Sequence, residues 1–194
     1  MRLKDLFTRK PQLPEIHNTR VLVCSAGTGF DELLNADASS YSRFYPSTTV
    51  KACSSIKELV AAIRQGYDIV HLFSNVSPGG IIMNAEGDPL SGASLIQTCC
   101  DSGVKLLWVA SDNKIDAYIK CFKTSGKSIN LVLTLNRRGP RFSSFLEKLL
   151  SKMADGETMP RAWVAIAPQG PPGPAHDDLP ESIFNAVRGN IRFR

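Results

Sequence analysis

Two short, mostly apolar runs constrain the fold of this chain more than any other feature of its sequence. They occupy residues 67–73 and 104–110, and small polar residues follow at Ser74, Asn75 and Ser111. Runs of this length are too short for most helices and are typical of strands buried on both faces of a parallel sheet. Open α/β sheets place ligands and catalytic groups at the carboxyl ends of their strands. Asn75 and Ser111 therefore occupy the two positions where a catalytic pair is expected.

The rest of the chain alternates predicted strands with predicted helices. We expect a small hairpin or extended flap at Gly79–Asn84 and Glu86–Pro89, and only one helical turn in the polar, serine-rich segment 31–46. This alternation predicts an α/β fold with a doubly wound, mostly parallel sheet that has helices on both faces. The further strands are expected at 20–25, 47–53 and 129–135, and the helices at 55–66, 91–103, 115–122, 140–156 and 159–167.

Composition divides the chain into four predicted parts. These are an N-terminal arm (1–18), a folded domain (19–167), a linker rich in proline and glycine (168–178) and a C-terminal docking segment (179–194). We expect Leu179–Arg188 to form one short amphipathic helix, which must dock on its own domain or on a partner because a lone short helix is marginal in water. The predicted partner-binding residues are apolar: Leu179, Ile183, Phe184, Val187 and Ile191.

Composition also limits the compartment and the partners. Hydrophobic residues make up 43% of the 194 residues, and no apolar run approaches the length of a membrane span. The N-terminal residues show no secretory signal, and five cysteines, an odd number set in apolar patterns, favour the reducing cytoplasm. The net charge of +5 is concentrated at the termini. No motif indicates nucleic-acid binding, so solvated termini are the preferred interpretation.

Three weak motifs do not predict a ligand. Gly27-Thr28-Gly29 follows a strand, but the third glycine of a dinucleotide fingerprint is missing and no well-formed helix is expected directly after it. Thr124–Ser128 imitates the end of a phosphate loop, yet its leading glycine is replaced by Cys121 and a strand follows it. The cysteines and histidines are scattered, so no metal site and no cofactor are predicted.

The two buried runs resemble the CHAT family of caspase-like cysteine peptidases. In that family, one strand ends in His-aromatic-small-Gly-His-Gly and the next main strand ends in Ser-Ala-Cys. Here the first reads His71-Leu72-Phe73-Ser74-Asn75-Val76 and the second reads Trp108-Val109-Ala110-Ser111. The segments around them are similar too, and the resemblance covers residues 20–167. It implies a caspase-like fold with a site at these two strand ends.

The departures from the family pattern concern its two catalytic residues. The family's histidine falls on Asn75 and its nucleophilic cysteine falls on Ser111. An amide does not titrate near neutrality, so Asn75 cannot take up the proton of a nucleophile, and a serine hydroxyl without a base is a poor nucleophile. Losing either member of such a couple costs several orders of magnitude in rate. The resemblance therefore implies a degenerate, inactive member.

The preferred hypothesis is a pseudoprotease that acts as a binding, scaffold or regulatory subunit. Its partner would be an effector or sensor protein, in a prokaryotic immune or conflict system by family analogy. A small-molecule signal is a further candidate ligand. The predicted cleft is lined by polar residues at the strand ends: Ser74, Asn75, Ser111, Asp112 and Asn113.

Two alternatives of other classes stay open. One is a hydrolase that uses Ser111 with His71 and Asp112, although strand alternation makes His71 more typical of a buried structural histidine. The other is a nucleotide-signal sensor that binds phosphate through Gly27-Thr28-Gly29 and the basic termini.

Overall fold

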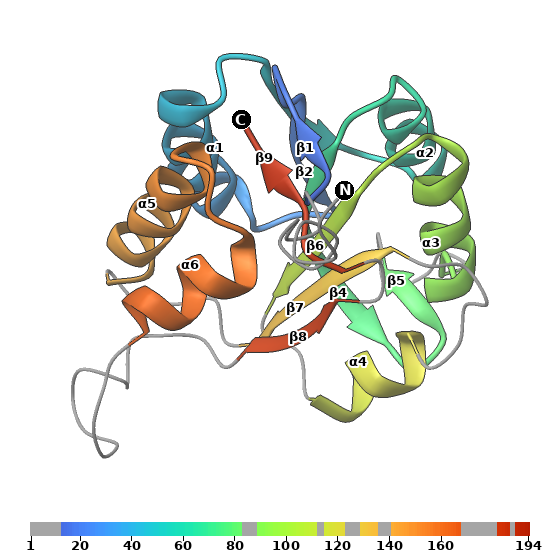
Figure 1. The fold of residues 1–194 in the computed structure, drawn as a ribbon. Helices are drawn as coiled ribbons and strands as arrows, with labels where there is room; N and C mark the ends of the chain where they lie inside the picture. Colours follow the sequence, from blue (N-terminus) through green and yellow to red (C-terminus); the bar gives the residue numbers. More distant parts are fainter. Residues whose placement is uncertain are drawn as a thin grey trace, which may run out of the picture.

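The computed structural model describes residues 13–82, 89–111, 115–122, 129–135, 141–167, 182–186 and 189–194. A central sheet runs through the molecule in the order β3-β2-β4-β6-β7-β8, with the short strand β5 paired to the end of β4 (Figure 1). Its strands are β2 (Val21–Ala26), β3 (Thr48–Cys53), β4 (Ile69–Ser77), β5 (Gly80–Ile82), β6 (Leu106–Ser111), β7 (Asn130–Leu135) and β8 (Ser182–Ala186).

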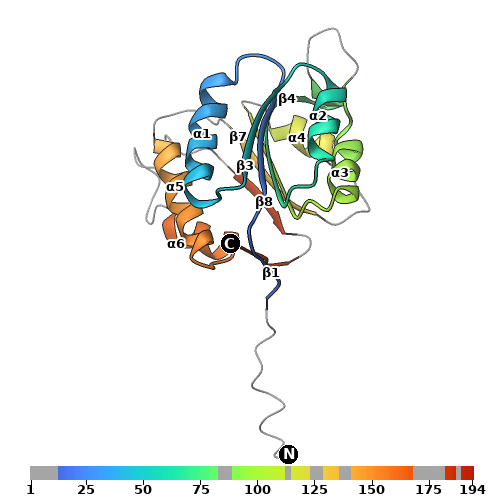
Figure 2. The ribbon, with the colours of Figure 1, turned by 90° about the horizontal axis from the view of Figure 1, so that it is seen from above.

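The sheet is parallel from β3 to β7, and helices cover both of its faces. Only β5 and β8 run antiparallel to their neighbours in this sheet. Figure 2 shows α1 (Asp31–Phe44), α5 (Arg141–Ala154) and α6 (Met159–Ile166) together on one face of the sheet. The other face carries α2 (Ile56–Ile63), α3 (Gly92–Asp101) and α4 (Ile115–Phe122). The predicted doubly wound α/β sheet is thereby confirmed.

Each face of the sheet has its own apolar core, because successive strand residues point to opposite faces. Along β6, Leu107 and Val109 belong to the cluster beneath α2, α3 and α4. Leu106, Trp108 and Ala110 belong to the cluster beneath α1, α5 and α6. The continuous apolar run that predicts this strand is therefore explained by burial on both sides.

Helix starts follow the capping signals in the sequence. The Ser55 side chain accepts a hydrogen bond from the backbone N–H of Glu58, at the N-terminus of α2. The Ser91 side chain accepts in the same way from the N–H of Ser94, at the N-terminus of α3. Such caps satisfy backbone donors that have no partner within the helix. The predicted starts of both helices are confirmed.

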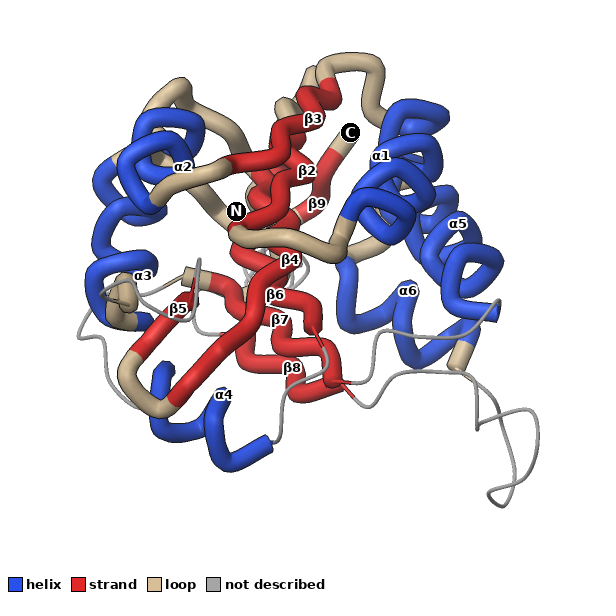
Figure 3. The backbone as a smooth tube through the Cα atoms, turned by 180° about the vertical axis from the view of Figure 1, so that it is seen from behind, coloured by secondary structure: helices blue, strands red, loops and turns tan. Residues whose placement is uncertain are grey.

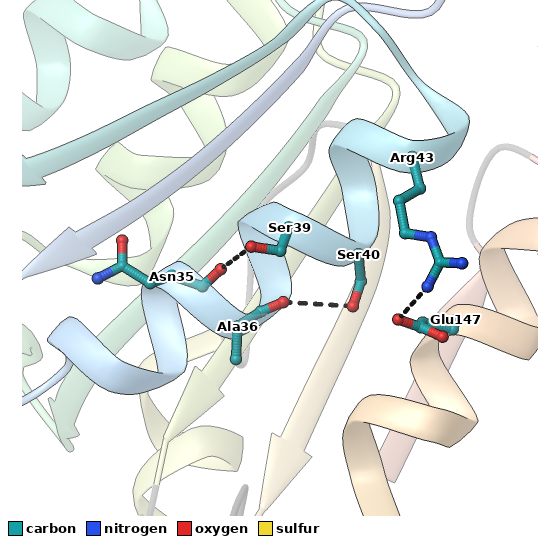
Figure 4. A network of polar contacts seen from close by, with 6 residues as sticks. All are labelled: Asn35, Ala36, Ser39, Ser40, Arg43 and Glu147. Atoms are coloured by element: carbon teal, nitrogen blue, oxygen red, sulfur yellow. Dashed lines mark hydrogen bonds and ion pairs between the residues drawn. The ribbon is translucent and has the colours of Figure 1, made fainter.

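The segment 31–46 was expected to hold a single helical turn, and this prediction is wrong. It forms the 14-residue helix α1. Figure 4 shows how α1 accommodates its serines: Ser39 donates to the carbonyl of Asn35 at 2.8 Å and Ser40 to that of Ala36 at 3.2 Å. These bonds satisfy the hydroxyls within the helix itself. Apolar burial of Leu34 and other α1 residues against the sheet then stabilises a segment whose sequence is a weak helix former.

The C-terminal helix expected at Leu179–Arg188 is also wrong. Residues 182–186 form β8, which pairs antiparallel with β7, so Ile183 and Phe184 belong to the sheet. Ile191 is buried in the core instead of being exposed to a partner. Leu179 and Val187 lie outside the described residues. The described parts of the predicted docking segment thus dock on their own domain.

A segment near the start of the described chain pairs with its C-terminal segment in a separate two-stranded sheet. β1 (Glu15–Ile16) pairs in parallel with β9 (Arg192–Phe193), which Figure 3 shows beside the central sheet. The side chains of Arg194 and Glu15 form an ion pair at 2.5 Å across this junction. Residues 13–18 of the predicted N-terminal arm are therefore joined to the domain, while residues 1–12 lie outside the described part.

Within the described ranges, no helix combines the length and the apolar character that crossing a membrane requires.

Candidate functional site at the carboxyl edge of the sheet

The ends of the central parallel strands line up on one edge of the sheet. Ala26 of β2 lies opposite Cys53 of β3 on one side and opposite Ser74 of β4 on the other. Phe73 lies opposite Ala110, so the next positions, Ser74 and Ser111, follow this pair on neighbouring strands. The two polar strand ends are thus brought to the same edge, as the sequence predicts.

The edge also contains the topological switch point of the sheet. Helix α1 connects β2 to β3 on one face of the sheet, and α2 connects β3 to β4 on the other face. The strands β3 and β4 pair with opposite sides of β2. Crevices at such points are the usual ligand sites of open α/β sheets. The candidate site therefore extends from β4 and β6 to the ends of β2 and β3.

On β4, the structure separates the roles of Ser74 and Asn75. Ser74 is fully buried, and its hydroxyl donates to the carbonyl oxygen of Asn75 at 3.0 Å. Asn75 is exposed and lies opposite Ile82 in the antiparallel pair of β4 with β5. The strand runs two residues beyond Asn75, to Ser77, which the sequence did not predict. Of these two predicted cleft residues, only Asn75 offers its side chain to solvent.

On β6, the predicted site residues are described only in part. Ser111 is the last residue of the strand, and its backbone lies opposite Leu135 of β7. Asp112 and Asn113 lie outside the described residues. The structure therefore gives the position of Ser111 along the strand end.

His71 lies on β4 but is enclosed within the core. Its ring stacks on Trp108 with centroids 4.8 Å apart and on Phe73 at 4.9 Å. The Nδ1 atom is hydrogen-bonded to the hydroxyl of Tyr41 at 3.2 Å, and Nε2 lies 3.6 Å from a carboxylate oxygen of Asp37. His71 is 0% exposed, so it has no contact with a substrate at the strand ends. The expected burial of this histidine is confirmed.

Four cysteine thiols of the domain are held in their protonated form. Burial raises the pKa of Cys24, on β2, and of Cys53, at the end of β3. Burial also raises the pKa of Cys99, on α3, and raises that of Cys121, on α4, to about 11. The thiolate is the nucleophilic form of cysteine, so none of these four side chains is activated for attack at neutral pH.

A hollow of about 400 Å³ lies where β2 and β3 end and α1 begins. Its wall includes the last residues of β3, residues that follow β2 and β3, and one residue from the first turn of α1: Gly27, Thr28, Asp31, Ala52, Cys53 and Ser54. The sequence pointed only to the glycine turn, because the other residues come from separate elements. Ser54 is already used locally, since its hydroxyl donates to Glu58 at 2.9 Å.

The hollow is poorly suited to phosphate. Gly27 and Gly29 have positive φ angles of 97° and 86°, and α1 begins at Asp31, so a strand, a glycine turn and a helix follow one another. This corrects the expectation that no well-formed helix follows the turn. The first turn of α1, however, carries Asp31 and Glu32. Two carboxylates repel an anion at the helix end that would otherwise attract it.

Within the described ranges, no group of three or more histidine, cysteine, aspartate or glutamate residues is arranged to hold a metal ion. The described part of the edge therefore provides amide and hydroxyl groups, a carboxylate at Asp31 and protonated thiols. Such groups can hydrogen-bond a ligand, but the described residues supply no base that would activate a nucleophile.

No known protein family matches this sequence. No curated protein matches it either. Among solved structures, the chain is similar to pro-sf-caspase-1, with a TM-score of 0.53 and 11% sequence identity over 97% of this chain and 97% of that chain. At this identity the likeness establishes the fold alone, and the fold is caspase-like.

Proposed function

We propose that this chain is a catalytically inactive, CHAT-like pseudoprotease that serves as a binding or scaffold subunit. The proposal starts from the caspase-like fold and from the resemblance of its two central strands to the family pattern. In that pattern Asn75 stands where the catalytic histidine is expected and Ser111 where the cysteine is expected. The partner is an effector or sensor protein of a prokaryotic immune or conflict system, in the cytoplasm.

The positions of the described histidines are the main support for the proposed loss of catalytic activity. Of the three histidines in the chain, the structure describes His17, in the loop after β1, and His71. His71 is buried between Trp108 and Phe73 and faces Asp37 and Tyr41. The exposed group on β4 is the amide of Asn75, which binds hydrogen-bond donors and acceptors alike but takes no proton at neutral pH.

The same geometry argues against a hydrolase that uses His71 as its base. A general base must lie within hydrogen-bond reach of the proton that it removes. Both ring nitrogens of His71 face α1, and both ring faces are covered by aromatic side chains. Reaching a nucleophile at the edge of the sheet would require the core around Trp108 to open.

A proteomic cleavage assay tests this function. The purified chain is incubated with a peptide library derived from a cell lysate, and new peptide ends are counted by mass spectrometry. The Ser111→Ala variant serves as the matched control. We expect the two proteins to give the same background of new ends. Cleavages made by the unaltered chain and absent from Ser111→Ala would contradict the proposal.

A further inference from the structure

Among the described strands, β3 forms an outer edge of the central sheet. It pairs in parallel with β2 along its whole length, from Thr48 to Cys53. No other described strand pairs with it, since β3 is the first in the strand order. Figure 3 shows β3 at the border of the sheet, between α1 and α2. An edge of this kind presents unpaired backbone N–H and C=O groups to any strand that can approach it.

The hydrogen bond between Val21 and Ser47 shows which residues face outward. The N–H of Val21 donates to the carbonyl oxygen of Ser47 at 3.1 Å, so the backbone of Ser47 faces β2. Along a strand, successive residues direct their N–H and C=O groups to alternate sides. Thr48, Val50 and Ala52 therefore direct their backbone donors and acceptors away from β2.

The side chains along this edge leave it open to solvent. Val50 is 45% exposed, so its branched side chain is available for contact with a partner. Thr49 and Ala52 are exposed, and Lys51 is half-buried. Lys51 lies on the α2 side of the sheet, where its charge adds to the hydrogen bonds from Ser54 that lower the pKa of Glu58. Val50, the neighbouring position, lies on the α1 side.

We propose that β3 is a docking edge for an extended segment of a protein partner, which adds one strand to the sheet. The partner segment places an acidic residue beside Lys51 and an apolar residue beside Val50. Backbone hydrogen bonds to Thr48, Val50 and Ala52 provide affinity, and the alternate side chains provide specificity. A carboxylate opposite Lys51 forms a favourable cross-strand pair, and a branched residue beside Val50 packs on its exposed surface.

The charge of Lys51 argues against a second copy of this chain as the occupant. Antiparallel pairing of two β3 strands centred on Val50 places the two copies of Lys51 on the same face, about 7–8 Å apart as diagonal neighbours. Centring the pair on Lys51 places the two ammonium groups directly opposite each other. Like charges in either arrangement destabilise the pair, and an edge lysine is a common barrier to self-pairing.

This edge is separate from the strand ends that carry Asn75 and Ser111, because β2 lies between β3 and β4. The inference therefore does not depend on whether the domain is catalytic. A failure of the test below leaves the proposed loss of peptidase activity untouched, and an active enzyme could still carry this docking edge.

Two synthetic peptides test the proposal. One alternates valine with glutamate over seven residues, and the matched peptide alternates valine with lysine. Binding is measured by fluorescence anisotropy with labelled peptide and the full chain. We expect the glutamate peptide to bind about fivefold more tightly than the lysine peptide, because the cross-strand pair with Lys51 is favourable for glutamate and unfavourable for lysine. Equal binding of the two peptides, or no binding of either, would overturn the proposal.

Amide hydrogen exchange shows where the glutamate peptide binds. We expect exchange to slow at the outward N–H groups of Thr48, Val50 and Ala52. The N–H groups of Thr49 and Lys51 already face β2 and are expected to change little. Slowed exchange elsewhere on the surface, without this alternating pattern in β3, would contradict strand addition.

Two variants separate edge binding from general misfolding. Val50→Pro removes an outward N–H that no described strand uses, so we expect it to abolish peptide binding while circular dichroism stays unchanged. Lys51→Glu keeps every backbone group and is expected to exchange the preference between the two peptides. A Lys51→Glu variant that is folded and still prefers the glutamate peptide would refute the assigned role of this charge.

Discussion

The side chains of Asp37 and His71 meet inside the protein, with a carboxylate oxygen 3.6 Å from Nε2 and both residues 0% exposed. The pair joins α1 to β4 beneath the aromatic rings of Phe73 and Trp108. Burying two such groups is unfavourable unless they interact with each other and with hydrogen-bonding neighbours. This contact therefore fixes α1 on the sheet, and it removes from solvent the one described histidine that lies on the strand of the candidate site.

Replacing Asp37 tests the structural role of this contact. Asp37→Ala leaves the imidazole of His71 buried beside a cavity, and we expect the free energy of unfolding to fall by about 3–5 kcal/mol. Urea denaturation monitored by circular dichroism measures the change. Asp31→Ala, at an exposed position in the same helix, is the matched control and is expected to change stability by less than about 0.5 kcal/mol. A loss below 1 kcal/mol for Asp37→Ala would show that the pair does not stabilise the fold.

The contact between α3 and α4 makes a second prediction. A Cβ added at Gly92 would lie 2.1 Å from the carbonyl oxygen of Cys121, so the backbone of one helix must move. We expect Gly92→Ala to lower the free energy of unfolding by about 1–3 kcal/mol, as overpacking does. Thermal unfolding measures the effect. Gly79→Ala is the control, because its nearest contact would be an ordinary 3.4 Å. Similar stabilities for the two variants would contradict the observed close approach.

The N-terminus of α2 predicts a pH dependence of stability. Hydrogen bonds from the backbone and hydroxyl of Ser54 lower the pKa of the exposed Glu58 carboxyl. Because the folded pKa is the lower one, the contribution is present above the unfolded pKa of about 4.3 and is lost as the pH falls through the folded value. Between pH 5 and 3 the free energy of unfolding declines as the pH falls. We expect Glu58→Gln to make this decline less steep, by about the contribution of one titrating carboxyl group. An unchanged slope would rule out this linkage.

The buried thiols predict slow alkylation of the folded protein. Burial keeps Cys24 and Cys99 protonated and excludes the reagent. We expect iodoacetamide at pH 8 to modify both at least about tenfold more slowly in buffer than in urea, with the half-buried Cys100 modified first. Peptide mass spectrometry assigns each site. Modification of Cys24 or Cys99 at the rate of the unfolded chain would show that the core around them opens readily.

The sequence predicts the central sheet well because its strands are buried on both faces. The runs around Leu72 and Val109 are almost entirely apolar, and this pattern depends only on the local sequence and on burial. The capping residues Ser55 and Ser91 act through bonds three residues away. Features determined by such short-range physics could be predicted from the sequence alone.

Helix α1 could not be predicted in this way because several of its buried residues are polar. Asp37 and Ser40 are buried alongside Leu34, so the helix lacks a clean apolar stripe. The partner that makes the burial of Asp37 favourable is His71, which lies 34 positions further along the sequence on β4. Tertiary contacts of this range override local propensity.

The C-terminal strand depends on similar long-range contacts. The pattern of Ile183, Phe184 and Val187 is compatible with an amphipathic helix. The edge of β7 is instead available for pairing, and residues 182–186 complete the sheet there. A five-residue segment has too little intrinsic preference to compete with such pairing.

The candidate site could be predicted from the sequence in part. The positions of Asn75 and Ser111 at the carboxyl edge follow from the two strands that carry them. The hollow beside them combines Thr28, Asp31 and Ser54 from separate elements, and only the strand order brings these together. No local sequence signal could have identified that wall.

Covalent labelling tests the central claim, that these strand ends cannot activate a nucleophile. The native chain is treated with a fluorophosphonate for serine and with a peptidyl ketone for cysteine, and its intact mass is then measured. We expect no adduct on Ser111 or on the four buried cysteines with either reagent, because the exposed side chain on β4 is the amide of Asn75 and the four buried thiols stay protonated. A single stoichiometric adduct on Ser111 or on one of these cysteines in the folded protein would contradict it.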